Sequence, residues 1–538
     1  MTKPSTPLLS IENLSVSFNK TQRVVDSISF TLYQGETFAL VGESGSGKSI
    51  TALSIVRLLP NNAQLTADKI NLNNEALLHY SEQQLCGIRG RRIGFIFQDP
   101  MSSLNPVMTI GSQIEEVLMI HFKLNKAQRH QRVLELLQQV EIPNPEKRIK
   151  DYPHQLSGGQ RQRIMIAIAL AANPDLLIAD EPTTALDVTI QAQLLSLLKR
   201  IQQQTGMALW LISHDLALVS TVADRVAVMQ RGKLVETGNT AAFFSNPKHP
   251  YTRQLLNALP RMSSATNRSI AEKIDMPLLQ VSDFSCYYPI RKGLFKRVVG
   301  HVKAVDGVSF SLARGKTLAL VGESGCGKTS LGKSLLNLIP NSGGEVIIDG
   351  VALHSLTGEA LRQQRASLQI VFQDPFASMN PRMLVGDIIA EGIQALHPQV
   401  SADERAQRVR ELLIQVDLPE TAALRYPHEF SGGQRQRICI ARALAVKPKL
   451  IVCDEPTSAL DVSVQAQIIQ LLKDLQAQYG MSYLFITHDF GVVAELADEV
   501  AVMYQGKIVE QGSVAQVLTA PRHHYTQSLL AAVPVLAE

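Results

Sequence analysis

Residues 42–49 of this chain have the sequence GESGSGKS, and residues 322–329 have the sequence GESGCGKT. Both octapeptides fit the pattern G-x-x-x-x-G-K-[ST], whose backbone N–H groups and lysine hold phosphate groups. Each follows a short apolar run, at 37–41 and 317–321, and precedes a helical pattern. A strand, a glycine-rich loop and a helix in this order predict a phosphate-binding site in each half of the chain.

The motifs that follow the two loops show that the chain contains an internal repeat. Lys48 and Lys328 are 280 positions apart. Three later pairs are each 274 positions apart, namely Gln160 and Gln434, Asp180 and Asp454, and His214 and His488. Spacings within each half therefore match over these motifs, which predicts two copies of one nucleotide-handling domain.

The repeat sets the expected domain organisation of the 538 residues. We predict one domain at 1–260, a polar and aperiodic linker at 261–277, and a second domain at 278–538. In each half, strands alternate with helices, which predicts an α/β fold with a mixed, mainly parallel sheet. Apolar residues spaced by 3.6 positions at about 105–155 and 380–430 predict a helical subdomain inserted into each core.

Composition and charge limit the classes of partner and the compartment. The 52 Lys and Arg nearly balance the 48 Asp and Glu, and a net charge of +4 gives no reason to expect nucleic acid as a partner. The basic run at 291–297 is the exception, and it is either a solvated loop or a contact for lipid headgroups or an acidic partner. The five cysteines include no C-x-x-C pair, which argues against disulfides and against zinc or iron–sulfur sites. No apolar run is long enough for a signal peptide or a membrane span, so we expect any membrane role to depend on other subunits.

Each residue of the glycine-rich loops has an expected task. The glycines let the backbone approach phosphate oxygens, Lys48 reaches the β- and γ-phosphates, and the Ser49 hydroxyl binds Mg²⁺. Lys328 and Thr329 repeat the last two roles. The predicted nucleotide-binding loop residues are Gly42, Glu43, Ser44, Gly45, Ser46, Gly47, Lys48, Ser49, Gly322, Glu323, Ser324, Gly325, Cys326, Gly327, Lys328 and Thr329.

Two carboxylates end a buried-looking strand in each half, within LLIADEP at 176–182 and LIVCDEP at 450–456. We expect Asp180 and Asp454 to hold Mg²⁺ and Glu181 and Glu455 to polarise the attacking water as catalytic general bases. An Asp-Glu pair at a strand end is often purely structural. The recurrence at one offset beside a glycine-rich loop favours the catalytic interpretation.

A histidine follows a later apolar strand in each half. His214 and His488 lie 34 residues beyond Asp180 and Asp454, respectively. A single histidine after a strand is usually structural. Because both copies place it at the same distance, we expect it to contact the γ-phosphate as part of the catalytic set.

A Ser-Gly-Gly-Gln segment precedes a helical pattern in each half. Such a helix start can bind an anion, although simple capping of the helix is the alternative. Since each half already has one phosphate loop, we expect this second anion site to serve the nucleotide of the other half. The residues concerned are Ser157, Gly158, Gly159, Gln160, Ser431, Gly432, Gly433 and Gln434.

These motifs, in this order, resemble the nucleotide-binding domains of ATP-binding cassette (ABC) transporters, twice and over nearly the whole chain. The resemblance implies ATP hydrolysis, with ATP between the glycine-rich loop of one half and the Ser-Gly-Gly segment of the other. It also implies that Gln98 and Gln373 bind nucleotide and metal, and that 184–187 and 458–461 are the D-loops of the family. Both sites are complete, so two hydrolytic sites are expected.

The resemblance further implies that Phe18 and Tyr288 stack on adenine. They lie near the ends of residues 8–18 and 279–288, whose alternation and β-branched residues are typical of edge-type strands. A core role for either ring remains open, and Tyr287 is an alternative to its neighbour Tyr288.

A narrower resemblance comes from QDPMSSLNPVMTIGSQI and QDPFASMNPRMLVGDII, and from the tails NPKHPYTRQLL and PRHHYTQSLL. These are similar to peptide and nickel importers, and the insert IRKGLFKR is most similar to the microcin C–type oligopeptide ATPase. The resemblance implies peptide uptake with two transmembrane permease subunits and a periplasmic or lipid-anchored substrate-binding protein. It implies a peripheral location on the cytoplasmic face of the inner membrane. Nickel or glutathione import remains the alternative.

Other tandem ATPases fit the sequence less well. A soluble translation factor has a long charged linker, and a DNA-repair ATPase has zinc cysteines or coiled-coil inserts. A non-hydrolytic regulator has a broken motif, whereas none is broken here. Cys326 lies within the second glycine-rich loop, and from the sequence we expect maleimide to label it and ATP to protect it.

Overall fold

The computed structural model describes residues 6–19, 22–184, 186–259, 277–292, 297–458 and 460–533. The chain forms two compact units. Unit 1 is built mainly from the chain up to Leu186 and from Ile190–Ala258, and unit 2 mainly from Leu259–Val533. The linker predicted at 261–277 lies outside the described residues except for its last position.

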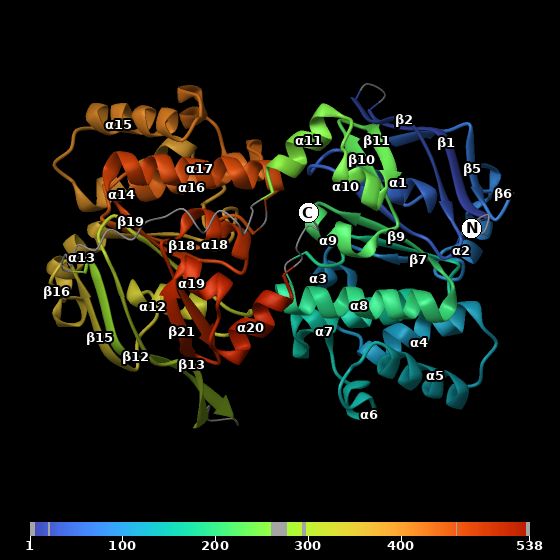
Figure 1. Cartoon of the computed structure of the whole chain (residues 1–538), viewed down its shortest axis with the longest axis horizontal. Helices are drawn as coiled ribbons and strands as arrows, with labels where there is room; N and C mark the ends of the chain where they lie inside the picture. Colours follow the sequence, from blue (N-terminus) through green and yellow to red (C-terminus); the bar gives the residue numbers. More distant parts are fainter. Residues whose placement is uncertain are drawn as a thin grey trace. The chain divides into compact units, whose positions relative to one another are not determined.

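In the described part of unit 1, six strands form a mainly parallel sheet in the order β11-β10-β3-β9-β8-β7. Of these, β11, β10, β9 and β7 are labelled in Figure 1. β11 is antiparallel to β10, and all other neighbours are parallel. Every residue of β3, β8 and β9 is buried, as expected for strands covered on both faces. The strands are β3 (Thr37–Val41), β7 (Ile93–Ile96), β8 (Leu176–Asp180), β9 (Ala208–Ser213), β10 (Arg225–Gln230) and β11 (Lys233–Asn239).

A second, antiparallel sheet of unit 1 contains the long strand β1 (Pro7–Phe18). β1 pairs with β2 on one side and with β4 and β5 on the other. The prediction of an edge-type strand was therefore wrong, because both rows of backbone groups in β1 are paired. The other strands are β2 (Gln22–Tyr33), β4 (Ala63–Thr66), β5 (Lys69–Leu72) and β6 (Glu75–Ala76).

Unit 2 repeats both sheets within its described residues. Its mainly parallel sheet has the order β17-β18-β19-β14-β20-β21, and its antiparallel sheet has the order β13-β12-β15-β16. β12 again lies inside its sheet, so the edge prediction fails here too. The strands are β12 (Leu279–Lys292), β13 (Arg297–Leu312), β14 (Thr317–Val321), β15 (Gly343–Ile348), β16 (Val351–Ala352), β17 (Leu368–Val371), β18 (Leu450–Asp454), β19 (Ser482–Ile486), β20 (Glu499–Tyr504) and β21 (Lys507–Ser513).

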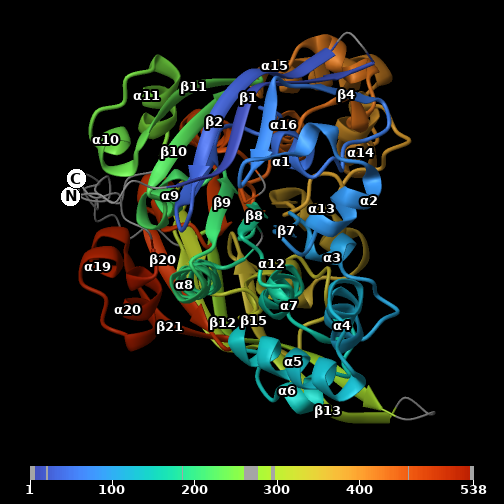
Figure 2. The ribbon, with the colours of Figure 1, turned by 90° about the vertical axis from the view of Figure 1, so that its right-hand side faces the viewer.

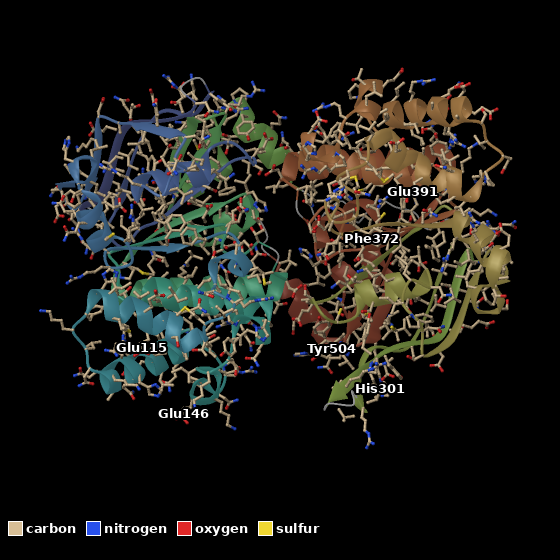
Figure 3. All side chains as sticks on the ribbon, turned by 180° about the vertical axis from the view of Figure 1, so that it is seen from behind. Glu115, Glu146, His301, Phe372, Glu391 and Tyr504 are labelled. Atoms are coloured by element: carbon tan, nitrogen blue, oxygen red, sulfur yellow. The ribbon has the colours of Figure 1, made fainter. Side chains whose placement is uncertain are left out.

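The second copy carries about ten extra residues, PIRKGLFKRV at 289–298, and the described ones lengthen one hairpin. β12 and β13 stay paired as far as Lys292 and Arg297, and His301 lies on this lengthened part of β13 (Figure 3). Residues 293–296 of the basic run are outside the described residues. In unit 1, the corresponding pair β1 and β2 ends at Phe18 and Gln22.

A helical subdomain interrupts each core as the sequence predicted. In unit 1 it contains α4 (Ile110–His121), α5 (Lys126–Gln139) and α6 (Pro145–Arg148), which Figure 2 shows gathered apart from strands β1 and β2. Local sequence explains these helices, because Thr109 caps α4, and Asn125 and Gln128 form a capping box at the start of α5. Ser401 and Glu404 form the same box for α15 in unit 2.

The α-helices of the described residues complete the two units. In unit 1 they are α1 (Lys48–Ile55), α2 (Glu82–Ile88), α3 (Pro100–Ser103), α4 (Ile110–His121), α5 (Lys126–Gln139), α6 (Pro145–Arg148), α7 (Gly158–Leu170), α8 (Val188–Thr205), α9 (Leu216–Val222), α10 (Thr240–Ser245) and α11 (Pro250–Asn257). In unit 2 they are α12 (Lys328–Leu335), α13 (Gly358–Ser367), α14 (Val385–Leu396), α15 (Ala402–Gln415), α16 (Gly432–Leu444), α17 (Val462–Tyr479), α18 (Phe490–Leu496), α19 (Val514–Thr519) and α20 (His524–Ala531).

Large buried side chains join the two sheets of unit 1. Phe30 of β2 stacks on Phe38 of β3 with ring centroids 5.3 Å apart, and it meets Trp210 of β9 edge-on at 5.2 Å. Aromatic pairs in such geometries add roughly 0.5–1.5 kcal/mol beyond the burial of their area. This contact fixes the antiparallel sheet against the strand that leads into the first glycine-rich loop. The predicted tandem α/β fold is confirmed.

Candidate active site

The glycine-rich loop, the Asp-Glu pair, the histidine and the glutamine of each unit gather at one edge of the mainly parallel sheet. β3, β9, β8 and β7 are neighbours in unit 1, and their carboxyl ends lead into the glycine-rich loop, His214, the Asp180-Glu181 pair and Gln98, respectively. In unit 2 the strands β14, β19, β18 and β17 arrange the matching residues in the same order. Parallel strands bring these distant segments together, because the carboxyl ends of all of them lie at one edge.

The glycine-rich loop requires glycine for steric reasons. Gly47 caps α1 with a φ of 106°, and Gly42 has a φ of 152°. A Cβ atom on Gly42 would lie 2.2 Å from the backbone oxygen of Met229 in β10. The backbone of the loop therefore passes close to a neighbouring strand as well as being free to approach a phosphate.

The loop lysine is held by the loop itself. Lys48 is 5% exposed, and its Nζ donates hydrogen bonds to the backbone oxygens of Gly42 at 2.7 Å and Glu43 at 2.9 Å. Lys328 makes the same two bonds, to Gly322 at 2.6 Å and Glu323 at 3.0 Å. The ammonium group is thereby kept at the loop, where it can neutralise a phosphate.

The hydroxyl after each lysine contacts the first carboxylate. Ser49 Oγ donates to Asp180 Oδ1 at 3.0 Å, and Thr329 Oγ1 donates to Asp454 Oδ1 at 2.9 Å. Burial is the main cause that raises the pKa of Asp180 to about 6, and burial likewise raises the pKa of Asp454. A hydroxyl beside a buried carboxylate is an oxygen donor set that Mg²⁺ favours, so these residues fit the expected ion.

The second carboxylate of unit 1 is surrounded by hydrogen-bond partners. Glu181 Oε2 accepts from Gln98 Nε2 at 2.9 Å and from Thr184 Oγ1 at 3.0 Å, and His214 Nδ1 lies 3.3 Å away. Burial acts to raise the pKa of Glu181, but the hydrogen bond and charge of His214, aided by Lys48, outweigh it and lower the pKa to about 2. Glu181 is therefore ionised at neutral pH, as a water-orienting base must be.

Unit 2 repeats this arrangement with one difference. Glu455 Oε2 accepts from Gln373 Nε2 at 3.0 Å, and His488 Nδ1 lies 3.5 Å from Glu455 Oε1. Burial opposes ionisation of Glu455, but His488 outweighs it and lowers the pKa of Glu455. Ser458, unlike Thr184, bonds the backbone oxygen of Glu455 at 3.1 Å rather than the carboxylate.

Both glutamates have an unusual backbone conformation. Glu181 and Glu455 each have a φ of 46°, in the left-handed region that glutamate rarely adopts. Their N–H groups donate to Ile212 at 3.0 Å and Ile486 at 2.9 Å on the neighbouring strand. The fold holds these two residues in a strained backbone conformation, and such strain commonly accompanies a functional site.

The Ser-Gly-Gly-Gln segments form helix starts. Ser157 Oγ accepts from the backbone N–H of Gln160 at 3.3 Å, and Gln160 Oε1 accepts from that of Ser157 at 3.2 Å. Ser431 and Gln434 form the same capping box at the start of α16. The capping role is thus observed, and a contact of these residues with nucleotide stays a prediction.

The predicted aromatic residues differ in their surroundings. Phe18 is half-buried at the end of β1. Tyr288 is 37% exposed, and its hydroxyl donates to Ser330 Oγ at 3.2 Å in α12, directly after the loop. Tyr287 instead bonds Asp306 of β13 at 2.5 Å. Of the two tyrosines, Tyr288 is therefore the one beside the glycine-rich loop.

Sequence reasoning missed a contact between each tail and its loop. The hydroxyl of Tyr251 accepts a hydrogen bond from the backbone N–H of Glu43 at 3.4 Å. The hydroxyl of Tyr525 accepts one from that of Glu323 at 3.1 Å. The recurrence of the His-x-Tyr-Thr-type tail in both halves was the signal that could have indicated a shared role for these tyrosines.

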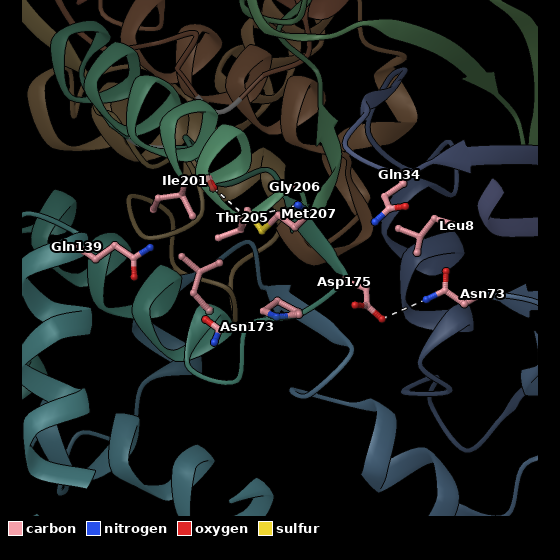
Figure 4. Close-up of a pocket in the computed structure, with 12 residues that line it drawn as sticks. Leu8, Gln34, Asn73, Gln139, Asn173, Asp175, Ile201, Thr205, Gly206 and Met207 are labelled. Carbon is pink, nitrogen blue, oxygen red and sulfur yellow. Dashed lines mark hydrogen bonds between the residues drawn. The ribbon is translucent and has the colours of Figure 1, made fainter. Parts of the chain in front are cut away.

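A separate cavity of about 140 Å³ in unit 1 does not belong to this site (Figure 4). It is lined by residues that precede β3, β8 and β9, including Gln34, Asp175 and Gly206, so it lies at the opposite edge of the sheet. Asn73 Nδ2 donates to Asp175 Oδ2 at 3.3 Å at its wall.

Family comparisons agree with this geometry. The ABC transporter family model matches residues 25–184 and 305–458, which include both glycine-rich loops and both Asp-Glu pairs. This chain is an ABC transporter ATP-binding protein. A second family, the C-terminal region of oligopeptide/dipeptide transporters, matches residues 235–291 and 509–538.

Curated relatives match this ABC protein over nearly its full length. The peptidoglycan transport ATP-binding protein YejF of Agrobacterium fabrum is 52% identical, covering 98% of this chain and 96% of that protein. An uncharacterized ABC transporter ATP-binding protein YejF of Escherichia coli is 49% identical, covering 97% and 99%. The glutathione import ATP-binding protein GsiA of Escherichia coli is 46% identical, covering 98% and 90%.

The family establishes the activity and the architecture. This chain is an ATPase with two fused ABC cassettes, each followed by an oligopeptide/dipeptide transporter tail. Among solved structures, a cassette with bound ADP and Pi is 28% identical and covers 44% of this chain and 98% of its own, with a TM-score of 0.40. Among the described residues, no helix has the length and hydropathy needed to cross a bilayer.

Proposed function

We propose that this ABC ATPase powers the uptake of peptides, of the oligopeptide or microcin C kind, through partner membrane permeases. The observation that carries this proposal is the presence of the oligopeptide/dipeptide transporter region after both cassettes. The names of two relatives support a peptide-containing cargo, since one transports peptidoglycan and another imports glutathione, itself a short peptide. Glutathione import is therefore the second candidate, and nickel import a third that the sequence alone left open.

The loops and carboxylates support hydrolysis in both cassettes. Lys48 and Lys328 neutralise the phosphates, and the ionised Glu181 and Glu455 orient the attacking water and accept its proton. Ser49, Thr329, Asp180 and Asp454 would hold Mg²⁺, together with Gln98 and Gln373. When bound, the ion supplies positive charge that offsets the charge developing on the phosphate oxygens.

The remaining predicted residues complete the proposed site. His214 and His488 contact the γ-phosphate through the ring edge that does not face the glutamate. Phe18 and Tyr288 stack on adenine. The position of the Tyr288 side chain beside α12 is in keeping with this role. The starts of α7 and α16 supply further phosphate contacts through their backbone N–H groups.

Membrane partners would dock close to the glutamine of each cassette. The segments after Gln98 and Gln373 expose large apolar side chains, including Val107, which is 80% exposed, and Phe376. Exposed apolar residues of this kind suit a cytosolic loop of a membrane protein. The proposed assembly contains two permeases and a periplasmic or lipid-anchored substrate-binding protein, with this chain peripheral on the cytoplasmic face of the inner membrane.

Two measurements together test the proposal. The purified chain should hydrolyse MgATP, and a deletion strain should lose uptake of radiolabelled tri- to hexapeptides but keep nickel uptake. Expression of the wild-type chain should restore peptide uptake, whereas Glu181→Gln with Glu455→Gln should not. A deletion strain that imports every tested peptide normally and loses only glutathione uptake would replace the first candidate by the second.

A further inference from the structure

We propose that Tyr251 and Tyr525 are positioning residues of the two phosphate loops, through which each transporter tail tunes ATP affinity. This inference rests on the proposed nucleotide role of the loops and goes beyond it. The tails become working parts of the ATP sites rather than appendages.

Each tyrosine forms a hydrogen bond with a loop residue that also binds the loop lysine. The N–H of Glu43 donates to Tyr251, while the backbone oxygen of Glu43 accepts from Lys48 at 2.9 Å. The residue is thus fixed at both its N–H and its C=O group. The tyrosine hydroxyl therefore restrains the loop backbone whose carbonyl groups hold the Lys48 ammonium group.

The tail of unit 1 is built to present this hydroxyl. Glu236 of β11 accepts hydrogen bonds from the backbone N–H groups of Lys248 at 2.8 Å and His249 at 2.9 Å. His249 Nδ1 then accepts from the N–H of Tyr251 at 3.2 Å and caps α11, which has Pro250 in its first turn. Tyr251 is only 6% exposed, so its ring is fixed by packing.

Unit 2 reproduces the arrangement with different neighbours, which supports a shared purpose. Glu510 accepts from the N–H groups of Arg522 at 2.7 Å and His523 at 3.1 Å, and His523 Nδ1 accepts from that of Tyr525 at 3.1 Å. The ring of Tyr525 lies against that of Tyr504, with centroids 4.2 Å apart. Tyr504 ends β20 (Figure 3) and has no counterpart in unit 1, where Gln230 ends β10.

The chemistry of the contact is that of a neutral hydroxyl on a backbone amide. Burial raises the pKa of Tyr525, so its hydroxyl stays protonated at every physiological pH. Such a hydrogen bond contributes roughly 0.5–1.5 kcal/mol, a factor of about 2–12 in an equilibrium constant. Because each hydroxyl acts through the loop backbone, the effect should fall on nucleotide binding.

The test is the double variant Tyr251→Phe with Tyr525→Phe in the full chain. Its KM for ATP should rise about 3- to 10-fold, with kcat within about twofold of wild type. Of the two single variants, Tyr525→Phe should raise KM more than Tyr251→Phe. The hydrogen bond of Tyr525 is shorter, at 3.1 Å against 3.4 Å for Tyr251. Tyr504→Phe is the matched control, because its hydroxyl meets Gln505 and not the loop, and its KM should not change.

Four outcomes are decisive. An unchanged KM in the double variant would overturn the inference, and so would a loss of kcat at constant KM. A lower melting temperature without nucleotide, accompanied by an unchanged dissociation constant for a non-hydrolysable ATP analogue, would also overturn it, because the hydroxyls would then be structural only. Failure of the wild-type chain to bind the analogue would instead refute the proposed nucleotide site itself.

Discussion

Gln373 donates its side-chain amide to the carboxylate of Glu455 at 3.0 Å. Gln98 makes the same contact with Glu181 at 2.9 Å. Each glutamine lies just beyond the end of a strand and just before a segment that exposes large apolar side chains. Displacement of either segment by a docked partner would therefore act directly on the carboxylate that we propose orients the attacking water.

The most direct prediction concerns the two glutamates. Glu181→Gln with Glu455→Gln keeps the shape of both side chains but removes the base, so ATP turnover should fall by about 10²–10⁴-fold. ATP binding should persist, because the lysines and the glycine-rich loops are unchanged. Steady-state phosphate release and equilibrium binding of ATP would measure the two effects separately.

The single variants serve as controls for this pair. Neither Glu181→Gln nor Glu455→Gln alone should bind ATP less tightly, because each variant leaves the lysines and the glycine-rich loops unchanged. Robust turnover by the double variant would remove both glutamates from the catalytic role.

A second prediction compares two glycines of one loop. A Cβ on Gly327 would lie 1.9 Å from the backbone oxygen of Ala304, whereas one on Gly325 would have no neighbour within 4 Å. Gly325→Ala should cost about 1–2 kcal/mol for its positive φ alone, and Gly327→Ala should cost more because backbone must move. Thermal unfolding monitored by circular dichroism would rank the two. Equal melting temperatures would show that the loop adapts to the extra atom.

A third prediction revises the expectation for Cys326. The side chain is 7% exposed, and burial raises the pKa of its thiol, so rapid alkylation is not expected. Cys86 is the exposed cysteine, and the other four are buried. A maleimide reagent should therefore label Cys86 first in the native chain, and all five in denaturant. Peptide mapping that finds Cys326 modified as fast as Cys86 would contradict the burial.

A fourth prediction follows from the carboxylates that hold the tails. Burial opposes ionisation of Glu236 and Glu510, but backbone N–H groups outweigh it and lower both pKa values from the ordinary 4.5. A lowered pKa stabilises the folded state above pH 4.5 and loses this contribution as the pH falls through the folded-state pKa. Glu236→Gln with Glu510→Gln should therefore lower the melting temperature at pH 7.

The acid limb of the same experiment is its control. The wild type and the double glutamine variant should converge in melting temperature once the pH falls below the lowered folded-state pKa values, where the wild-type carboxyls are also neutral. A constant difference between them at every pH would assign the effect to shape rather than charge.

Much of this site was predictable because its residues end parallel strands. The spacing of Lys48, Asp180 and His214 recurs in the second copy, and a strand of buried residues precedes each of these segments. A motif at the carboxyl end of such a strand has little freedom, since neighbouring strands fix its place at the sheet edge. The spacing of the motifs was therefore enough to predict that these distant residues lie close together.

Other features depend on tertiary pairing that local pattern does not record. β1 alternates like an edge strand, but its second neighbours, β4 and β5, are strands of only four residues each. The hydrogen bond between Glu43 and Tyr251 joins residues 208 positions apart, and the sequence of neither segment indicates the contact. The burial of Cys326 likewise depends on its place in a cluster of buried residues from both sheets of unit 2 rather than on the loop sequence.

The capping box at Ser157 has a consequence for how this chain tolerates change over generations. One hydroxyl already closes the first turn of α7, and the neighbouring N–H groups are the ones that we propose to bind a phosphate. A substitution of Ser157 would have two effects. It would remove a helix cap worth roughly 1 kcal/mol, and it would disturb the phosphate contact that we propose for this helix start. We therefore expect substitutions of Ser157 to be poorly tolerated, and the same holds for Ser431, which caps α16 in the same way.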